Sequence, residues 1–193
     1  MNSIEKTNNQ GGFSIVLLSG GIDSAACVHY YSSQSFRTRG FFVDYGQPPA
    51  QREKLSAAQI SFYYNIKLDV FQLTPCKFSN GGEIKGRNGL FIFAALLYYP
   101  RYSGLIASGI HSGTPYYDCS EVFIRDISKI LNGYTNGQVV LDMPFLKWNK
   151  QMIYEYCKQN NVPIYMTYSC ETNNDKPCGK CLSCLDRKTL NAG

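Results

Sequence analysis

Short apolar runs, rich in β-branched and aromatic residues, alternate along the chain with longer stretches in which apolar and polar positions mix. The runs typical of buried strands are residues 13–18, 38–45, 66–73, 104–108 and 138–143. Helices are expected between them, one beginning near Asp23 and the others over residues 46–64, 90–99 and 120–131. This alternation predicts an α/β fold, a parallel sheet with helices on both faces.

The loop SGGIDS, residues 19–24, joins the first expected strand to the first expected helix. The unpaired N–H groups and partial positive charge of a helix amino terminus favour bound anions. Gly20 and Gly21 carry no side chain that would keep a phosphate from the backbone. Ser19 and Ser24 offer hydroxyl donors. We interpret the loop as a phosphate cradle without the lysine of a Walker A motif, with an ordinary turn capped by Asp23 as the alternative.

Two further polar stretches follow expected strands, VDYGQ at residues 43–47 and SGIHSGTPYYDC at residues 108–119. Ligands bind to such sheets beyond the carboxyl ends of the strands, where these stretches and SGGIDS all fall. This shared position favours the phosphate interpretation. A ligand-binding role for His111 is therefore a hypothesis, whereas His29 lies inside the first expected helix and is assigned to packing.

Four cysteines gather near the end of the chain, at positions 170, 178, 181 and 184. Four thiolates suit a tetrahedral zinc ion, and Gly179 allows a tight turn around a metal. An iron–sulfur cluster, a redox dithiol and unliganded reduced cysteines are the alternatives. The other cysteines are expected to be small buried residues: Cys27, Cys76, Cys119 and Cys157.

The 193 residues are enough for one core and a small appendage. We expect a flexible lead-in at residues 1–12, an α/β domain at 13–168 and a four-cysteine segment at 169–193. The net charge of +5 suits an anionic ligand without indicating nucleic acid. The polar amino terminus and the short apolar run at 90–99, well below the roughly 20 residues of a membrane span, favour a cytoplasmic protein that does not enter a membrane.

SGGIDS together with the carboxy-terminal pattern C-x7-CGKC-x2-C-x2-R resembles the 7-cyano-7-deazaguanine synthases, the QueC-like branch of the PP-loop ATP pyrophosphatases. Further agreement covers nearly the whole chain: VDYGQ, GRN at residues 86–88, YYDC at 116–119, Phe123, the segment 144–150 and Arg187. The resemblance implies a PP-loop, HUP-like and hence Rossmann-like domain at residues 13–168.

The chemistry that the resemblance implies uses ATP and Mg²⁺ to adenylate the carboxylate of 7-carboxy-7-deazaguanine, releasing pyrophosphate. Ammonia then displaces AMP to give an amide, and a second activation gives the nitrile, preQ0, a precursor of queuosine. Nothing in the sequence resembles a glutaminase module that would generate the ammonia. Zn²⁺ would be structural, held by Cys170, Cys178, Cys181 and Cys184.

The resemblance also implies roles for particular residues. The catalytic candidates are Asp23, Arg87 and Lys150. The candidates for contact with the nucleotide are Ser19, Gly20, Gly21, Asp23, Ser24, Val43, Tyr45, Gly46, Gln47 and Gly109. The candidates for contact with the deazapurine are Asn88, His111, Tyr116, Asp118 and Glu121.

The sequence departs from the family pattern in the segments that are expected to bind the substrate. GQPP at residues 46–49 replaces GQRH, IKGRN replaces VPGRN, and Ser120 and Glu121 replace an Arg-Asp pair. Three alternatives follow: a QueC-like paralogue of anti-phage defence, of the CBASS type, that joins a deazaguanine to a protein amine; a tRNA-modifying PP-loop enzyme; and a non-catalytic nucleotide-binding subunit. The 15 Tyr and 11 Phe are compatible with a homodimer.

Overall fold

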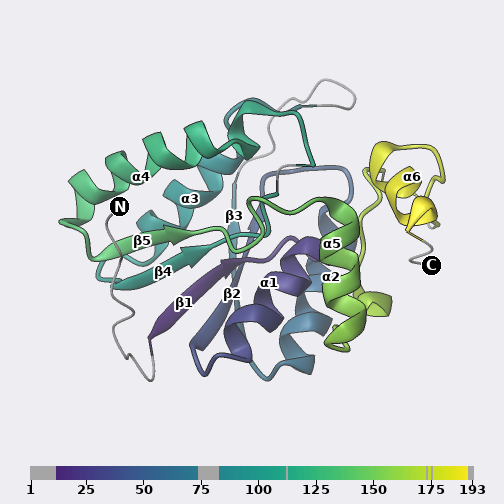
Figure 1. Ribbon diagram of the computed structural model, residues 1–193, viewed down its shortest axis with the longest axis horizontal. Coiled ribbons are helices and arrows are strands. Elements are labelled where there is room, and N and C mark those ends of the chain that lie inside the picture. Colours follow the sequence, from purple (N-terminus) through teal and green to yellow (C-terminus); the bar gives the residue numbers. More distant parts are fainter. Residues whose placement is uncertain (1–11, 74–82, 112, 173, 175, 191–193) are drawn as a thin grey trace.

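The computed structural model describes residues 12–73, 83–111, 113–172, 174 and 176–190. Strands and helices alternate along the chain (Figure 1). In order they are β1 (Phe13–Leu17), α1 (Ile22–Ser32), β2 (Arg37–Asp44), α2 (Ala50–Tyr63), β3 (Lys67–Gln72), α3 (Arg87–Tyr98), β4 (Gly104–Ala107), the 3₁₀-helix η1 (Tyr117–Cys119), α4 (Glu121–Thr135), β5 (Val139–Asp142), α5 (Lys150–Gln159), the 3₁₀-helix η2 (Ile164–Met166) and α6 (Leu182–Thr189).

The sheet has the strand order β3-β2-β1-β4-β5, and every pairing is parallel. β1 lies at the centre, where Ile15 is opposite Arg39 on β2 and Ile106 on β4. The chain moves outward from β1 to β3 and then returns through α3 to β4, so the order reverses between β1 and β4. Ligands of open parallel sheets bind at such a reversal, beyond the carboxyl ends of the strands. The predicted α/β fold with a parallel sheet is confirmed.

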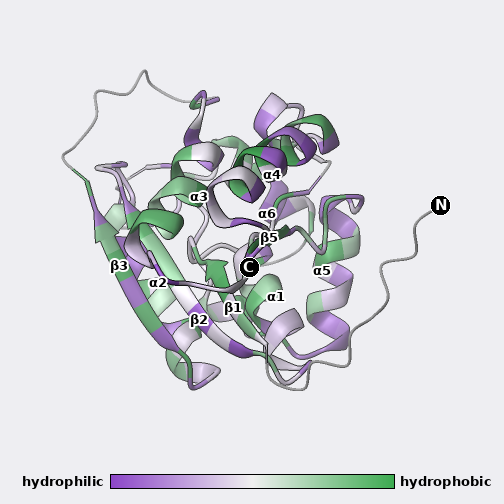
Figure 2. Ribbon diagram, turned by 90° about the vertical axis from the view of Figure 1, so that its left-hand side faces the viewer, coloured by the Kyte–Doolittle hydropathy of each residue, from purple (hydrophilic) through white to green (hydrophobic). Residues whose placement is uncertain are grey.

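Helices cover both faces of the sheet because successive side chains of a strand point to opposite sides. Val16 and Leu18 pack with α1, α2 and α5, whereas Ile15 and Leu17 pack with α3 and α4. Figure 1 shows α1, α2 and α5 on one side of the sheet and α3 and α4 on the other. In Figure 2 the hydrophobic colour of β1 lies between helices that carry both hydrophobic and hydrophilic turns.

Two helices are longer than their patterns predict. α3 begins at Arg87 instead of residue 90, because Gly86 in the left-handed conformation lets the helix start one turn earlier. α4 continues to Thr135 and ends at Asn136, which has a positive φ of 51°. The turn-forming residues before Asn136 stay helical, since the Thr135 hydroxyl accepts a hydrogen bond from the Val139 N–H and ties the helix to β5.

The cysteines outside the terminal cluster are buried as predicted where the structure describes them: Cys27, Cys119 and Cys157. Cys76 lies outside the described residues. Among the described residues, no helix combines the length and the apolar character that crossing a bilayer requires.

A buried carboxylate ties β2, β3 and α3 together at the far side of the sheet from β5. Asp69 accepts hydrogen bonds from Arg39 at 2.9 Å and from the Tyr99 hydroxyl at 2.6 Å, and Lys67 lies 3.1 Å away. Burial raises the pKa of Asp69, but these donors outweigh it and hold the pKa below its usual value.

Replacing this carboxylate tests whether it stabilises the fold. We expect Asp69→Asn to lower the free energy of unfolding at pH 7 by about 1–3 kcal/mol, because three donors lose a charged acceptor. A pKa that is lowered in the folded state stabilises the protein at pH values above the usual pKa of about 3.9. This stabilisation is lost as the pH falls through the folded-state pKa. The difference in unfolding free energy between the wild type and Asp69→Asn should therefore shrink below about pH 4. Urea unfolding measures it. The control is Asp126→Asn, which removes the carboxylate of the exposed Arg125–Asp126 pair. A loss of stability in Asp69→Asn that does not change with pH, or an equal loss in Asp126→Asn, would contradict this role.

Candidate functional site

The loop SGGIDS follows β1 and packs directly onto α2. Gly20 has a φ of +86°, and a Cβ atom there would lie 2.5 Å from the backbone oxygen of Glu53. The Gly20 carbonyl accepts a hydrogen bond from the Tyr168 N–H at 2.9 Å. The loop therefore lies between α2 and the segment that leads to the cysteine cluster, and only glycine fits at its second position.

The two serines of the loop differ in what they can offer a ligand. Ser24 is buried, and its hydroxyl donates to the Gly21 carbonyl at 2.9 Å. Ser19 is exposed and donates to the Ser24 oxygen over a longer distance of 3.3 Å. Ser24 thus braces the turn, while the Ser19 residue is exposed and the first N–H groups of α1 have no partner within the helix.

Lys150 and Asp23 bring two helix amino termini together. Asp23 lies in the first turn of α1, and Lys150 is the first residue of α5. The Lys150 ammonium donates to Asp23 Oδ2 at 2.5 Å, with both side chains about three-quarters buried. Asp23 Oδ1 is buried and has no hydrogen-bond partner among the described residues. The site holds a fixed cation beside an acceptor oxygen with free lone pairs.

His111 and Gly109 bring the loop after β4 to the same place. A Cβ atom at Gly109 would lie 2.5 Å from the backbone oxygen of Asp23, so this loop packs against the first turn of α1. His111 Nε2 is 3.7 Å from Asp23 Oδ2, and His111 Nδ1 accepts a hydrogen bond from the Gly113 N–H. Burial lowers the pKa of His111. The imidazole is therefore neutral at pH 7, with its proton on Nε2 facing Asp23.

Gln47 shapes the turn VDYGQ from within. Its side-chain oxygen accepts from the Tyr45 N–H at 3.0 Å, and its NH₂ donates to the Val43 carbonyl at 3.4 Å and to Glu53 at 2.7 Å. The Gly46 N–H is bound to the Asp44 carboxylate. The Tyr45 and Gly46 N–H groups and the Gln47 amide are thus occupied internally, and of the predicted nucleotide contacts in this turn Gly46 is half-buried while the others are buried.

Arg87, at the start of α3, faces the end of β2 and the start of α2. Its charge and hydrogen bond counter the rise that burial causes in the pKa of Tyr45. Its charge also lowers the pKa of Glu53, against the larger effect of burial. Arg87 Nε is buried and has no hydrogen-bond partner in the part of the chain that the structure describes.

Asn88 and Asp118 are brought together, but as partners of each other. The Asn88 N–H donates to Asp118 Oδ2 at 3.2 Å, and the Asn88 side chain donates to the Asp118 carbonyl at 3.1 Å. Both residues are buried. This pair anchors η1 to the amino terminus of α3, so their predicted contact with substrate stays a prediction.

A cavity of about 410 Å³ lies between η1, the start of α4 and the segment after β5. Tyr116, Cys119 and Glu121 are among its lining residues, with Leu146 from the segment after β5. Burial raises the pKa of Cys119 to about 11, so its thiol is neutral at pH 7. The cavity offers aromatic surface and one carboxylate.

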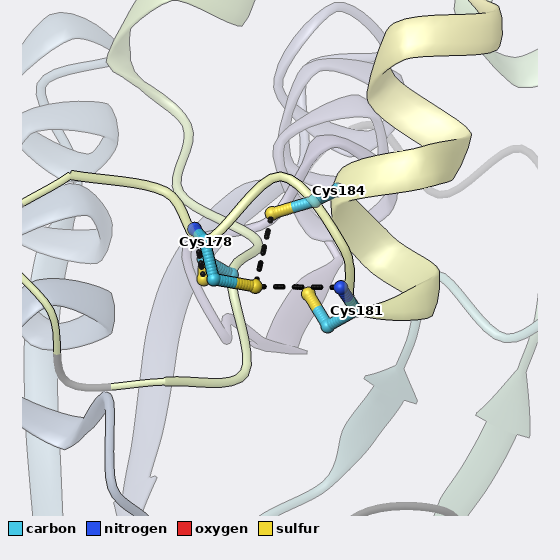
Figure 3. A group of neighbouring side chains, drawn as sticks. Cys178, Cys181 and Cys184 are labelled. Carbon is cyan, nitrogen blue, oxygen red and sulfur yellow. Dashed lines mark hydrogen bonds between the residues drawn. The ribbon is translucent and has the colours of Figure 1, made fainter.

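The four terminal cysteines form one cluster, with all their sulfur atoms within 4.8 Å of one another. Figure 3 shows Cys178, Cys181 and Cys184 turned toward a common centre, and the sulfurs of Cys178 and Cys184 are 4.0 Å apart. Tetrahedral zinc, with Zn–S bonds of about 2.3 Å, requires sulfurs about 3.8 Å apart. The cluster fits a zinc ion after a small contraction.

The cysteine segment is connected to the loop SGGIDS through a few residues. Tyr168, two positions before Cys170, donates its N–H to Gly20. Arg187 on α6 donates to the Thr167 hydroxyl at 2.8 Å, and Leu190 is buried in the core with α1 and α5. The predicted boundary at residue 169 stays a prediction, since the segment shares both hydrogen bonds and core with the sheet domain.

Comparison with known families identifies the chain. The model of the family described as "Queuosine biosynthesis protein QueC" matches residues 13–81 and 80–191. The chain belongs to the QueC family. The predicted resemblance is confirmed.

Relatives of this QueC-family chain include enzymes named 7-cyano-7-deazaguanine synthase. The protein from Prochlorococcus marinus strain MIT 9312 is 31% identical over 207 residues, covering 91% of each chain. The protein from Campylobacter jejuni subsp. doylei is 26% identical over 202 residues, covering 90% of each chain. The sequence similarity to these relatives therefore extends over nearly the whole of this QueC-family chain.

Two solved structures share the fold. NMN synthetase from Francisella tularensis superposes with a TM-score of 0.52 at 18% identity, covering 82% of this chain and 65% of that one. The NH3-dependent NAD synthetase from Campylobacter jejuni superposes with a TM-score of 0.51 at 16% identity, covering 86% of this chain and 72% of that one. At these identities they support the fold alone.

Some residues of the QueC-family site carry no signal in the sequence. Glu53 stands in an ordinary charged helix start, QREK, yet it contacts both Gln47 and the backbone at Gly20. Tyr168 contributes only its backbone N–H to the loop. Neither contact could be found from residue type or spacing.

The packing of Gly20 gives a first test of the site. We expect Gly20→Ala to weaken binding of the Mg²⁺ complex of ATP by at least about tenfold and to destabilise the fold by roughly 2 kcal/mol, because a methyl group meets the Glu53 carbonyl and the positive φ is strained. Calorimetric binding and urea unfolding measure the two effects. The control is Gly133→Ala in α4, where nothing lies within 4 Å of the added carbon. Unchanged binding in Gly20→Ala would show that the loop is not used.

The cysteine cluster predicts the metal content. We expect one zinc per purified chain and no iron or sulfide, measured by elemental analysis, because four thiolates match tetrahedral zinc. Cys181→Ser should lose most of the zinc and lower the melting temperature, whereas Cys119→Ala, outside the cluster, should keep the zinc. Iron with sulfide, or a disulfide in place of metal, would contradict the prediction.

Proposed function

We propose that this QueC-family protein is an ATP-dependent ligase that adenylates the carboxylate of 7-carboxy-7-deazaguanine and condenses it with ammonia, giving the amide and then the nitrile preQ0. Family membership and relatives named 7-cyano-7-deazaguanine synthase support the substrate class. The observation that carries the proposal is the Lys150–Asp23 pair beside the intact SGGIDS loop at the carboxyl edge of a parallel sheet.

The first step needs a cationic, donor-rich site for the departing pyrophosphate. A carboxylate oxygen attacks the α-phosphorus of ATP, the bond from phosphorus to the bridging oxygen breaks, and negative charge accumulates on the leaving group. Fixed donors and cations aimed at that charge lower the barrier. In our proposal the first N–H groups of α1, the exposed Ser19 hydroxyl and the Lys150 ammonium supply them.

Magnesium fits the same place through Asp23. Its Oδ1 atom is buried without a hydrogen-bond partner among the described residues, and Mg²⁺ commonly binds one or two carboxylates together with phosphate oxygens. When bound with ATP, the ion neutralises part of the phosphate charge. The hydrogen bond from Lys150 orients the Asp23 carboxylate, and Gly109 packs closely on the backbone of Asp23.

The cavity at η1 is the proposed pocket for the deazapurine. Tyr116 offers an aromatic face, and the carboxylate of Glu121 can accept hydrogen bonds from the N–H groups of a guanine-like edge. The loop that leads to this cavity begins at Gly109, which packs on Asp23. The base and the phosphates would therefore be held by the two ends of one loop.

The later steps use the same groups. Ammonia adds to the acyl carbon and loses a proton to water as AMP departs, which gives the amide. The amide oxygen then takes a second adenylyl group, and loss of AMP with the remaining N–H protons leaves the nitrile. Lys150 and the α1 amino terminus would hold pyrophosphate in both activations.

The assay for this proposal supplies ATP, Mg²⁺ and 7-carboxy-7-deazaguanine, with and without ammonium, and follows pyrophosphate and the mass of the base. We expect nitrile in the wild type and a fall in the rate of pyrophosphate release of at least about a hundredfold in Lys150→Met, since a fixed cation is lost from the transition state. Lys129→Met, an exposed lysine on α4, should retain the wild-type rate.

Each failure of the assay has a distinct meaning. Pyrophosphate release that stops at the adenylate or amide would overturn the nitrile product and favour a paralogue with a protein amine as acceptor. No pyrophosphate release with this acid would overturn the proposed substrate. A Lys150→Met enzyme as fast as wild type would remove Lys150 from the mechanism.

A further inference from the structure

His111 lies in the loop that follows β4, and one of its ring nitrogens faces Asp23. The His111 side chain is 10% exposed, and its Nε2 atom lies 3.7 Å from Asp23 Oδ2. The other histidine of the chain, His29, lies in α1 and packs against the rings of Tyr64 and Tyr156. His111 is therefore the imidazole that belongs to the candidate site.

The loop fixes the position and the tautomer of the His111 ring. The Gly113 N–H donates to His111 Nδ1 at 3.1 Å, so the proton of the neutral imidazole is on Nε2. A Cβ atom at Gly113 would lie 2.9 Å from His111 Nδ1, and a Cβ atom at Gly109 would lie 2.5 Å from the Asp23 carbonyl oxygen. The loop thus packs closely at both points, and the Nε2–H group faces the Asp23 carboxylate as a donor.

The two oxygens of the Asp23 carboxylate differ in their partners. Oδ2 accepts a hydrogen bond from the Lys150 ammonium at 2.5 Å. Oδ1 is buried and has no hydrogen-bond partner among the described residues, which leaves it for a metal ion. At 3.7 Å, His111 Nε2 is too far from Oδ2 for a hydrogen bond while Lys150 occupies that oxygen.

The proposed function gives Lys150 a second partner, the pyrophosphate. An ammonium that turns to the phosphates leaves Asp23 Oδ2 without its donor, and an acceptor in a side chain that is only 24% exposed is costly to leave unpaired. His111 Nε2–H already points to this oxygen. An approach of about 0.7 Å brings the two atoms to an ordinary hydrogen-bond distance of about 3.0 Å.

We propose that His111 is a positioning residue for Asp23: its Nε2–H takes over the hydrogen bond to Oδ2 when Lys150 turns to the phosphates, and so keeps Oδ1 aligned for Mg²⁺. This inference rests on the proposed function, because it takes ATP with Mg²⁺ as the ligand of Lys150 and Asp23. It goes beyond that function by assigning His111, whose predicted contact is with the deazapurine, to the orientation of the metal ligand.

Two substitutions at His111 separate the donor from the packing of the loop. In His111→Asn the amide oxygen can take the place of Nδ1 and accept from Gly113, but the side chain ends before the position of Nε2. In His111→Gln the side chain is one carbon longer, and its NH₂ can donate to Asp23 from near the position of Nε2. Residues that orient metal ligands commonly contribute ten- to a hundredfold to metal affinity, so the first variant should lose what the second retains.

The first experiment measures the dissociation constant of α,β-methylene-ATP by calorimetry on the zinc-loaded full chain, with saturating Mg²⁺ and in magnesium-free buffer. With Mg²⁺ we expect His111→Asn to bind at least about tenfold more weakly than the wild type, and His111→Gln to stay within about threefold of it. Without Mg²⁺ all three should agree within about twofold, because His111 acts through Asp23 and not on the phosphates. The matched control is His29→Asn, the same substitution at the other histidine, which should bind as the wild type does.

Three outcomes of this experiment would overturn the inference. An unchanged affinity of His111→Asn with Mg²⁺ would show that the donor is not used. Equal weakening with and without Mg²⁺ would show a merely structural role. A His111→Gln variant as weak as His111→Asn would show that a donor at this position does not restore the metal ligand.

The second experiment keeps the inference testable if the His111 variants fold poorly. Nitrogen-15 NMR of the imidazoles resolves His111 from His29, since the chain has two histidines. We expect the Nε2–H proton of His111 to move downfield when the Mg²⁺ complex of α,β-methylene-ATP binds, and also in nucleotide-free Lys150→Met, where Asp23 Oδ2 has lost its ammonium donor. The His29 signals should stay in place. A His111 signal unchanged in both samples would overturn the inference. Absence of nucleotide binding by the wild type would overturn the proposed function, and the Lys150→Met spectrum alone would then decide whether His111 bonds to Asp23.

Discussion

Two backbone contacts, each without room for a methyl group, set the geometry of the whole carboxyl edge. Gly20 lies on the carbonyl of Glu53, and Gly109 lies on the carbonyl of Asp23. Through them the loops after β1 and β4 and the starts of α1 and α2 pack against one another. Ser19, Asp23 and His111 lie in these loops and helix starts, and Lys150 reaches Asp23 from the start of α5. The order of the sheet makes this packing available, because β1 has β2 on one side and β4 on the other.

Charge at this edge is concentrated in one partly buried pair. The Lys150 ammonium donates to Asp23 Oδ2, so this cation is held in place at the amino termini of α1 and α5. In the proposed function a triphosphate with its magnesium ion would compete for both members of this pair. The cysteine segment supports the arrangement from behind, through the bond from Tyr168 to Gly20 and from Arg187 to Thr167.

Much of this could be predicted from the sequence, for physical reasons. Buried parallel strands leave continuous apolar runs, and the loop SGGIDS and the cysteine spacing are local patterns, so the fold, the glycine turn between β1 and α1 and the clustering of the four cysteines were all accessible. The side chains that act across elements were not. Ser24 was expected to face a ligand but donates to Gly21, and Asn88 and Asp118 pair with each other. Glu53 gave no signal, because its partners come from other elements and spacing along the chain does not encode them.

The central claim is that this edge activates a carboxylate by adenylation, and an isotope transfer tests it most directly. Turnover of 7-carboxy-7-deazaguanine labelled with ¹⁸O in both carboxylate oxygens should yield AMP in which each molecule carries one ¹⁸O atom, since one acid oxygen leaves on phosphorus when the amide is formed and the other when the nitrile is formed. Mass spectrometry of the nucleotide reads the label. Unlabelled AMP, or label found in inorganic phosphate with ADP as the nucleotide product, would contradict adenylation.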